Sequence, residues 1–569
     1  MSTAVEERLA SRPEPGPATR PHPGRPAALV VATWFFLASI TPSLIPHAWH
    51  LQGVASGLSA AYGYGLGLAG AWIWRRVRDH IGFRVTLAPV WSRRLRRGAT
   101  IGGMAVVALI WLWSLQWQRE TARLVQAPVP GPLRLVLGLV ATVLVFVLVI
   151  LAARGLRALV RQSSRLGQRF LRPWIATTLA AVLVTGLVLV LSNSVVYGRT
   201  MDYLAAKAAV ANSRTPDGRM APASPLRSGS PASAETWASL GRNGQAFVAD
   251  GSSAAAITAA TGRPAQEPIR VYAGLSGGRT LEQVAAAVVA ELRRTGAFDR
   301  SVLALMTTTG RGWVDEWSAS SIEYLTGGDS AVAAMQYSYL PSPVALVSDR
   351  RTPAAAGRIL LSTVEAELAA RPAGTRPRLV LGGESLGAYG GQAAFSGPDD
   401  MLARVDGAVW VGTPNFTPLV RTLTAERRRG SPEVVPVIGD GEHIRFASSP
   451  AELTRDLYGR AYGTWATPRV AYVQHASDPI ARWSPSLLTT EPDWMREGAG
   501  TDLPEMNFTT FATFWQLTVD LMVAGTTPAG HGHRYHEELV PAWAGVLGLD
   551  PAADWSHVQQ SIERNYHPV

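Results

Sequence analysis

Residues 383–387 read GESLG and match the motif G-x-S-x-G, with Ser385 at its centre. In this motif a serine hydroxyl is exposed on a sharp turn between a strand and a helix, where it attacks an acyl carbon as a nucleophile. Residues 274–278 read GLSGG and match the motif as well, with Ser276 at the centre. The motif predicts serine hydrolase chemistry, and the flanking residues indicate which of the two serines is the better candidate.

The sequence around Ser385 fits such a turn better than the sequence around Ser276. The apolar run RLVLGG predicts a strand over 378–383, and LGAYGGQAAF predicts a helix directly after the serine. Ser276 also follows an apolar run, but its helix is predicted to begin near Thr280, an N-cap candidate, which leaves a loop between strand and helix. We therefore predict Ser385 as the nucleophile and Ser276 as a turn residue or a group lining the cleft.

Asp478 is the best candidate for the acid that orients the base. In hydrolases with this motif the chain order is nucleophile, acid and histidine. Asp478 lies in HASDPI, after the apolar run VAYVQH at 470–475 that predicts a strand. Neither Asp406 nor Asp440 directly follows a convincing strand. The alternative interpretation is that Asp478 only forms an Asp-Pro turn.

Three histidines follow the candidate acid in the segment PAGHGHRYHEELV, namely His531, His533 and His536. A serine nucleophile needs a base, and a downstream loop histidine is expected to supply it. We predict His533 as the base, with His531 as the alternative, because His536 is expected to begin the next helix. A metal site is the competing interpretation. The chain has no cysteine and no H-E-x-x-H spacing, so neither a metal nor a cofactor is predicted.

Backbone N–H groups must also stabilise the oxyanion that forms during acyl transfer. One donor is expected from Leu386, the residue after the nucleophile. The other is expected from the loop TTGRGW at 308–313, where Gly310 and Gly312 would let the backbone approach the substrate. A simple glycine turn is the alternative interpretation of this loop.

The pattern that must position these residues begins at residue 269. Short apolar runs alternate with helical stretches, which predicts a mostly parallel sheet flanked by helices, an α/β-hydrolase-like catalytic domain over 269–569. The strand candidates are 269–275, 302–307, 333–339, 378–383, 407–412 and 470–475. Residues 201–268 are rich in Ala, Ser, Pro and Gly, and we interpret them as a linker and packing segment.

The first 200 residues indicate a multi-span α-helical membrane domain. Five apolar stretches each approach or exceed the roughly 20 residues that a helix needs to cross a bilayer, and the bilayer requires them to be helical. They are 27–46, 53–74, 99–117, 132–153 and 174–197. We predict a transmembrane domain of five spans over 27–200, preceded by a cytoplasmic tail over 1–26.

The placement of arginines predicts the orientation of the spans. Segments 75–98 and 154–173 together carry a charge of +13, whereas the whole chain carries +11. The positive-inside rule places both segments, and with them the N-terminus, in the cytoplasm. Because five is odd, the catalytic domain is expected outside the cytoplasm, in a multi-pass protein of the cell membrane. The rest of the chain has no net positive charge, which argues against a nucleic-acid partner.

The second predicted span is rich in glycine. Gly53 and Gly57 are four residues apart, as are Gly63 and Gly67, and small residues at this spacing allow helices to approach closely. Packing among the five spans is the preferred interpretation, and a homodimer through this span is the alternative. No charged residue lies in the middle of a span, which argues against a transporter and favours an anchor or a lipid-access platform.

Many blocks of the sequence, taken in order, resemble the actinobacterial membrane α/β-hydrolase family. They include SITPSLIPH near the first span, and RVYAGL, GRGWVDEW, GESLGAYGGQAAFS, YVQHASDPIARWSP and GHGHRY in the C-terminal half. The resemblance implies a membrane serine hydrolase in which an N-terminal multi-span domain precedes the hydrolase domain. It agrees with Ser385 as the elbow serine and with Asp478 and the GHGH histidines as its partners, and it leaves His531 and His533 undecided.

The predicted activity is hydrolysis of, or acyl transfer from, an ester of a membrane lipid or an acylated envelope substrate. An anchored domain outside the cytoplasm would meet such substrates at the membrane surface. An amide substrate, as for a peptidase, is a further alternative. A protein that is not an enzyme is the other alternative, namely an envelope scaffold or binding protein with a hydrolase fold. The intact set of Ser, Asp and His argues against it.

Overall fold

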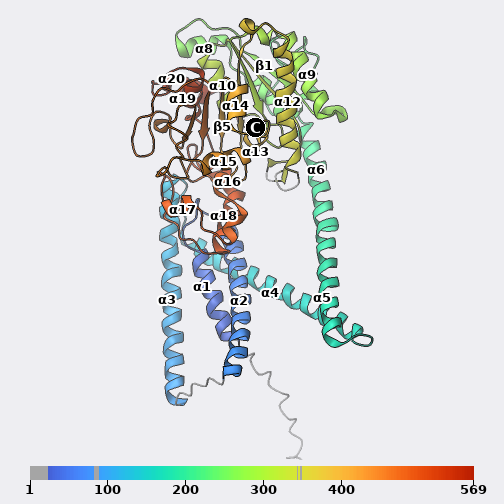
Figure 1. Ribbon diagram of the computed structural model, residues 1–569, viewed down its shortest axis with the longest axis vertical. Helices are drawn as coiled ribbons and strands as arrows, with labels where there is room; N and C mark the ends of the chain where they lie inside the picture. The colour runs from blue at the N-terminus through green and yellow to red at the C-terminus, as the bar shows by residue number, and fades with distance from the viewer. Residues whose placement is uncertain (1–23, 82–88, 343, 346–348, 569) are drawn as a thin grey trace, which may run out of the picture.

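A parallel sheet of seven strands forms the centre of the C-terminal half (Figure 1). The computed structural model describes residues 24–81, 89–342, 344–345 and 349–568. The strand order is β1-β3-β2-β4-β5-β7-β6, and every neighbouring pair is parallel. The strands are β1 (Ile269–Ala273), β2 (Val302–Thr307), β3 (Ser330–Met335), β4 (Arg378–Glu384), β5 (Gly407–Val411), β6 (Ile444–Ala447) and β7 (Arg469–Val473). The predicted α/β-hydrolase-like sheet is thereby confirmed, with β6 as an additional edge strand.

Helices cover both faces of the sheet, so the strands are buried on both sides. In β2, Leu303 and Leu305 point into one core, whereas Ala304 and Met306 point into the other. Strands buried on both faces read as nearly continuous apolar runs, which is why the sequence pattern predicts them. The first core is closed by α9 (Leu281–Arg294) and α12 (Arg351–Ala369), and the second by α10 (Glu316–Leu325) and α19 (Leu539–Leu547).

The segment over 201–268 contains more regular structure than its composition indicates. It holds the end of α6 (Gly198–Asn212), a short 3₁₀ turn (Trp237–Leu240), α7 (Gly241–Ala249) and α8 (Ala254–Thr261). Phe247 of α7 is buried against Tyr272 of β1, with 5.9 Å between the ring centroids. This segment therefore contributes side chains to the core of the hydrolase domain.

The N-terminal helices follow the five predicted apolar stretches. Residues 1–23 of the predicted cytoplasmic tail and 82–88 of the first arginine-rich segment lie outside the described residues. The helices are α1 (Arg25–Ser39), α2 (Trp49–Ile81), α3 (Pro89–Leu124), α4 (Leu133–Gly167), α5 (Pro173–Val190) and α6 (Gly198–Asn212), with a π-helical turn (Leu191–Tyr197) joining the last two.

Three helical stretches among the described residues are long and apolar enough to cross a membrane: Arg97–Leu124, Leu133–Gly167 and Pro173–Asn212. Helix α1 is apolar but has only 15 residues. It ends at Ser39 because Pro42 disfavours helical backbone at the residue before it. Helix α2 has 33 residues and is rich in glycine and alanine. The N-terminal region is therefore an α-helical domain with three candidate membrane spans.

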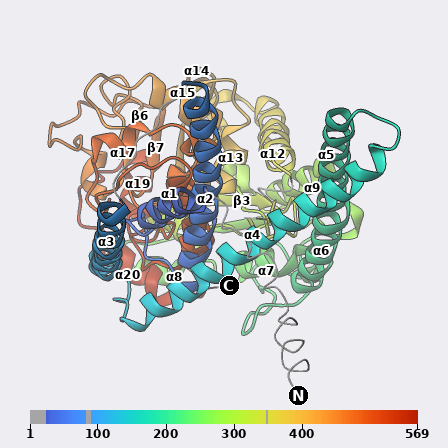
Figure 2. The same cartoon turned by 90° about the horizontal axis from the view of Figure 1, so that it is seen from below.

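The N-terminal helices stand on one side of the hydrolase domain (Figures 1 and 2). Helices α1, α2 and α3 lie together as one bundle, and α5 continues through α6 as a long rod that rises to the hydrolase domain. Helix α4 crosses obliquely beneath the domain and joins the two groups. The bundle and the rod therefore contact the hydrolase domain at separate places.

The glycines of α2 are used for contacts within the chain. Gly53 and Gly57 pack on α4, and Gly63 and Gly67 pack on α1. A Cβ atom at Gly57 would lie only 2.6 Å from the Cβ of Val145, so a larger residue there would push the helices apart. Both pairs of small residues thus face helices of the same protein.

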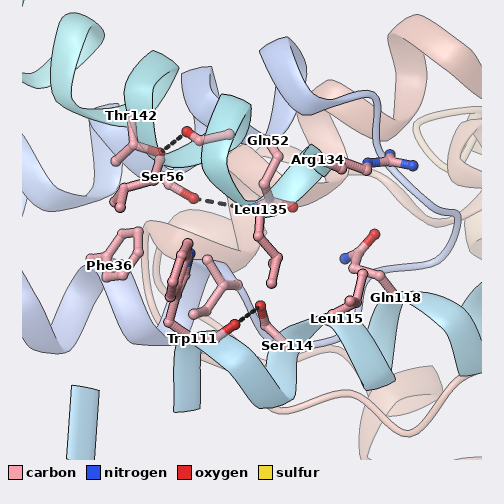
Figure 3. A pocket seen from close by; sticks show the side chains of 13 residues that line it. Phe36, Gln52, Ser56, Trp111, Ser114, Leu115, Gln118, Arg134, Leu135 and Thr142 are labelled. Carbon is pink, nitrogen blue, oxygen red and sulfur yellow. Dashed lines mark hydrogen bonds between the residues drawn. The ribbon is translucent and has the colours of Figure 1, made fainter. Parts of the chain in front are cut away.

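A small cavity of about 40 Å³ lies between α1, α2, α3 and α4 (Figure 3). Its walls combine apolar side chains such as Leu135 with the polar side chains of Gln52, Gln118 and Arg134. The amide of Gln52 donates a hydrogen bond to the Oγ of Ser56 at 2.9 Å. The volume corresponds to a few water molecules, so this is a small, mostly apolar gap between the helices with a few polar groups in its wall.

Candidate active site

Ser385 occupies the turn between β4 and α13 (Leu386–Gln392). Its backbone angles are φ +55° and ψ −120°, a region that residues other than glycine rarely adopt. Its N–H donates to the carbonyl oxygen of Val411 on β5 at 2.9 Å. Gly387 passes so close to the end of β2 that a Cβ atom there would collide with the carbonyl oxygen of Thr307. The strained serine between two closely packed glycines has the geometry of a nucleophile elbow.

Asp478 follows β7 and is the N-cap residue of α16 (Pro479–Arg482). Its Oδ1 accepts the N–H of Ile480 at 2.8 Å. Its Oδ2 lies 2.7 Å from Nδ1 of His533 and also accepts the O–H of Tyr535 at 2.7 Å. Burial alone would raise the pKa of Asp478, but His533 and these donors hold the pKa below its usual value. The carboxylate is therefore ionised and bonded to one specific histidine nitrogen.

His533 uses Nδ1 for Asp478 and points Nε2 toward the strand that carries the serine. Nε2 lies 4.0 Å from Oε1 of Glu384, the residue directly before Ser385. The ring also packs on Gly412, where a Cβ atom would lie 2.6 Å from its Cε1. Ser385, Asp478 and His533 therefore gather at the carboxyl ends of β4, β5 and β7. An imidazole with one nitrogen on a carboxylate and the other free can act as a general base.

The two neighbouring histidines have different partners. His531 turns its Nδ1 toward Oδ2 of Asp502 at 3.4 Å, and Asp502 also accepts the O–H of Ser477. His536 stacks on Trp317 with 5.2 Å between ring centroids, and burial lowers its pKa. Within the described ranges, no group of three or more His, Asp or Glu side chains is arranged to hold a metal ion. The three histidines thus belong to three separate environments.

The loop after β2 lies against the elbow, but its two glycine N–H groups already have acceptors. Gly310 N–H donates to the Oγ of Ser342 at 3.2 Å, and Gly312 N–H donates to the carbonyl oxygen of Thr309 at 2.9 Å. Leu386 begins α13, so its N–H belongs to the first turn, where helices leave N–H groups without an intrahelical partner. Of the candidate oxyanion donors, Leu386 has the more suitable position.

A buried carboxyl next to the candidate triad is not predicted by the sequence pattern. Glu384 is surrounded by protein, and burial, followed by the charges of Asp315, Asp478 and Glu538, raises its pKa well above the usual value. The raised pKa favours the neutral carboxyl of Glu384 beside His533. Its place directly before Ser385 in the GESLG motif is the signal that identifies it.

Tyr535 connects the acid loop to the base loop. It donates its O–H to Asp478 and accepts the backbone N–H of His475 at 3.1 Å. Its ring stacks on that of His475 with 4.1 Å between centroids. His475 in turn contacts the carbonyl oxygen of Gly532 at 2.9 Å and Glu538 at 2.8 Å. These contacts fix the segment 531–535 against the end of β7.

Comparisons with known proteins give two matches to family descriptions. Residues 269–561 match the family described as "Alpha/beta-hydrolase family", and residues 40–252 match the "Alpha/beta-hydrolase family N-terminus". A search among curated proteins finds no match. Among solved structures, the chain is similar to a Trichoderma reesei cutinase in complex with a phosphonate inhibitor, at 13% sequence identity and a TM-score of 0.19. That similarity covers 42% of this chain and 88% of the cutinase chain.

Proposed function

Because this chain belongs to the alpha/beta-hydrolase family, we propose that it is a serine hydrolase with Ser385 as nucleophile, His533 as base and Asp478 as orienting acid. The observation that carries the proposal is the 2.7 Å contact between Asp478 and His533 beside a serine in elbow geometry. His531, the alternative base, faces Asp502 instead. The pairing of His533 with the acid that follows β7 favours it as the base.

The geometry supports acyl transfer in two steps. As the Ser385 Oγ attacks the carbonyl carbon of an ester, Nε2 of His533 takes the hydroxyl proton and passes it to the departing alcohol. A water molecule, or a second alcohol in a transfer reaction, then gives a proton to His533 and attacks the acyl-serine. His533 returns that proton to the Ser385 Oγ as the acyl–oxygen bond breaks, which releases the acid or the new ester and restores the free serine. The carboxylate of Asp478 stabilises the imidazolium that forms in each step.

The oxyanion of each tetrahedral intermediate needs preorganised N–H donors. The N–H of Leu386 is the first donor in this proposal. The second belongs to the loop over 308–312, in which the Gly310 N–H would exchange Ser342 for the substrate oxygen. Removal of a single donor of this kind typically costs about 10²- to 10³-fold in rate.

The substrate class we propose is an ester of a membrane lipid or of an acylated envelope component. Three helices apolar enough to span a membrane support a membrane anchor. The edge of the sheet that carries α16, and with it Asp478, is turned toward α1 and α2 (Figure 1). An active site on this side would receive its ester from the membrane. The arginine-rich segments further favour a cytoplasmic N-terminus and an extracytoplasmic hydrolase domain.

Hydrolysis of short p-nitrophenyl esters by the full chain in detergent micelles tests the proposal. We expect release of p-nitrophenol by the unmodified protein and its loss in Ser385→Ala. Ser276→Ala is the matched control, because Ser276 sits in a short turn after β1 and should leave the rate unchanged. Activity that persists in Ser385→Ala would contradict the assignment. An inactive unmodified protein would favour a scaffold on a hydrolase fold.

A further inference from the structure

The hydrolase domain and the N-terminal bundle meet at α18 (Ala512–Val523), which lies between the sheet and helices α1 and α2 (Figure 1). Val519 of α18 is buried in a cluster with Leu51 and Ala55 of α2. Phe511, at the start of α18, stacks on Tyr62 of α2 with 3.8 Å between ring centroids. One side of α18 is therefore packed on the bundle.

A buried carboxylate on this side of α18 is held by the loop between α1 and α2. Asp520, His47 and Ser43 are each at most 1% exposed. Nε2 of His47 lies 2.6 Å from Oδ1 of Asp520, and the hydroxyl of Ser43 donates to Oδ2. A buried charge is costly unless it is paired. A carboxylate of the hydrolase half thus depends on partners from the N-terminal half.

The hydrogen bonds around His47 favour a form in which both of its nitrogens carry protons, opposite an ionised Asp520. Nδ1 faces Oε1 of Gln52 at 2.9 Å. The orientation of the Gln52 amide is set by its Nε2, which donates to the carbonyl oxygen of Ser39 at 2.8 Å and to the Oγ of Ser56. Because both ring nitrogens face acceptors, only the imidazolium form donates to both. His47 and Asp520 form an ion pair with no nitrogen left to act as a base.

The other side of α18 contacts the loop of the catalytic acid. Trp483, which directly follows α16, donates its Nε1–H to the Oγ1 of Thr518 at 2.9 Å. Phe514 packs on the same indole with 5.7 Å between ring centroids. Asp478 is the N-cap residue of α16, so α18 supports the short helix that the acid begins.

The end of α18 contacts the loop of the base. The carbonyl oxygen of Ala524 accepts the backbone N–H of His533 at 3.0 Å. Ala524 lies four residues, about one helical turn, after Asp520. The buried ion pair is therefore one turn away from the hydrogen bond that holds the base.

We propose that Asp520 and His47 are positioning residues for the reaction: by tying α18 to the loop between α1 and α2, they hold Asp478 and His533 in reacting geometry. The inference rests on the proposed function of these two residues. It makes the N-terminal bundle a part of the catalytic unit in addition to an anchor. A displacement of α1 and α2 relative to α18 is then transmitted to the acid and the base.

The test measures how a fluorophosphonate labels the full chain in detergent micelles, with the maximal labelling rate separated from the affinity for the probe. Asp520→Asn is expected to lower the maximal rate by about tenfold or more, because small misplacements of catalytic groups cost large rate factors. The affinity should change by less than about threefold, since the probe does not contact α18 in this account. This split distinguishes positioning from binding.

Val558→Ala is the matched control for loss of stability. Val558 is fully buried in α20 (Ser556–Asn565), which packs on α8 and α10, away from α18. Its truncation lowers the melting temperature but should leave the maximal labelling rate unchanged. An equal fall in this variant would overturn the inference, because the effect of Asp520→Asn would then be general destabilisation.

Two further variants decide the outcome even where Asp520→Asn fails to fold. Ser43→Ala keeps the ion pair and removes one hydrogen bond, so a smaller fall in the maximal rate, about two- to threefold, is expected. His47→Gln combined with Asp520→Asn should be no worse than either change alone, because the pair acts as a unit. If the unmodified protein is labelled and the Ser43→Ala and Asp520→Asn variants are labelled at the same rate as it, the inference is overturned but the proposed function stands. If the unmodified protein is not labelled, the proposed function is overturned as well.

Discussion

Two histidine–aspartate pairs in this protein have nearly the same contact distance and different surroundings. His533 lies 2.7 Å from Asp478 at the carboxyl edge of the sheet, and His47 lies 2.6 Å from Asp520 where the bundle meets the hydrolase domain. The second nitrogen of His47 is bonded to Gln52, whereas that of His533 points toward Glu384 at 4.0 Å, beyond hydrogen-bonding distance.

This difference shows what makes such a pair a base. The aspartate orients the ring in both cases, but only a histidine with an available nitrogen can take a proton from a nucleophile. A histidine whose two nitrogens both donate is a cation, and it stabilises the junction it occupies. A histidine beside an aspartate is therefore assigned to catalysis by the surroundings of its second nitrogen.

The largest effect is expected when the pair of His533 and Asp478 is broken, because His533 has the available nitrogen. His533→Ala should lower the rate of p-nitrophenyl ester hydrolysis by about 10³- to 10⁴-fold, because the serine loses its base. His531→Ala, the matched control, should cost less than about tenfold, since His531 faces Asp502. The reverse order of the two effects would make His531 the base.

The second-largest effect is expected when Asp478, the acid that orients His533, loses its negative charge. Asp478→Asn should lower the hydrolysis rate by about 10²- to 10⁴-fold while the protein stays folded, because the amide no longer stabilises the imidazolium. Asp502→Asn provides the comparison, since Asp502 is a buried carboxylate of the neighbouring loop. A larger loss of activity in Asp502→Asn than in Asp478→Asn would contradict the assignment of the acid.

The junction pair should also affect stability, in addition to its effect on the labelling rate. Burial alone would lower the pKa of His47 and Arg134 opposes its charge, but Asp520 outweighs both and the pKa is raised. The stabilisation is therefore complete below about pH 6.5 and is lost as the pH rises through the raised pKa. Breaking a buried pair typically costs about 3–5 kcal/mol.

The melting temperatures of the unmodified protein and Asp520→Asn measure this dependence. Their difference should be larger at about pH 6 than at about pH 9, because a larger fraction of His47 is protonated and paired with the Asp520 carboxylate at the lower pH. The difference between the unmodified protein and Val558→Ala should not change with pH, since no titrating group is involved. A difference for Asp520→Asn that stays constant over this range would contradict a pair whose histidine loses its proton between these two pH values.

The smallest effect is expected next to the nucleophile. The raised pKa of Glu384 favours its neutral carboxyl, and Glu384→Gln resembles that neutral form. The hydrolysis rate should change by less than about threefold, as usual for a near-isosteric change that leaves charge unaltered. A loss of more than about 30-fold would mean that the ionised carboxylate takes part in the reaction.

The sheet follows from the sequence to a large extent because its strands are buried on both faces. Six of the seven strands overlap the apolar runs that predict them. β6 is the exception, since IRFA has four residues, includes Arg445 and follows a loop with Gly439 and Gly441. Such a short edge strand has no distinctive sequence pattern, and residues 444–447 are recognised as a strand only by their pairing with β7.

The candidate site follows from the sequence only where local pattern and chemistry coincide. The strand, glycine and helix around Ser385 predict an elbow, and the structure has that geometry there. His531 and His533 are two residues apart in one loop, so only their contacts separate them. The partners His47 and Asp520 are 473 residues apart, and no local pattern links them.

Mass spectrometry of the full chain after exposure to a fluorophosphonate measures whether Ser385 is a reactive nucleophile. We expect a single phosphonyl adduct on the peptide that contains Ser385, and no adduct on that peptide in His533→Ala over the same time. An adduct on Ser276, or an unmodified Ser385 in the folded, unmodified protein, would contradict it.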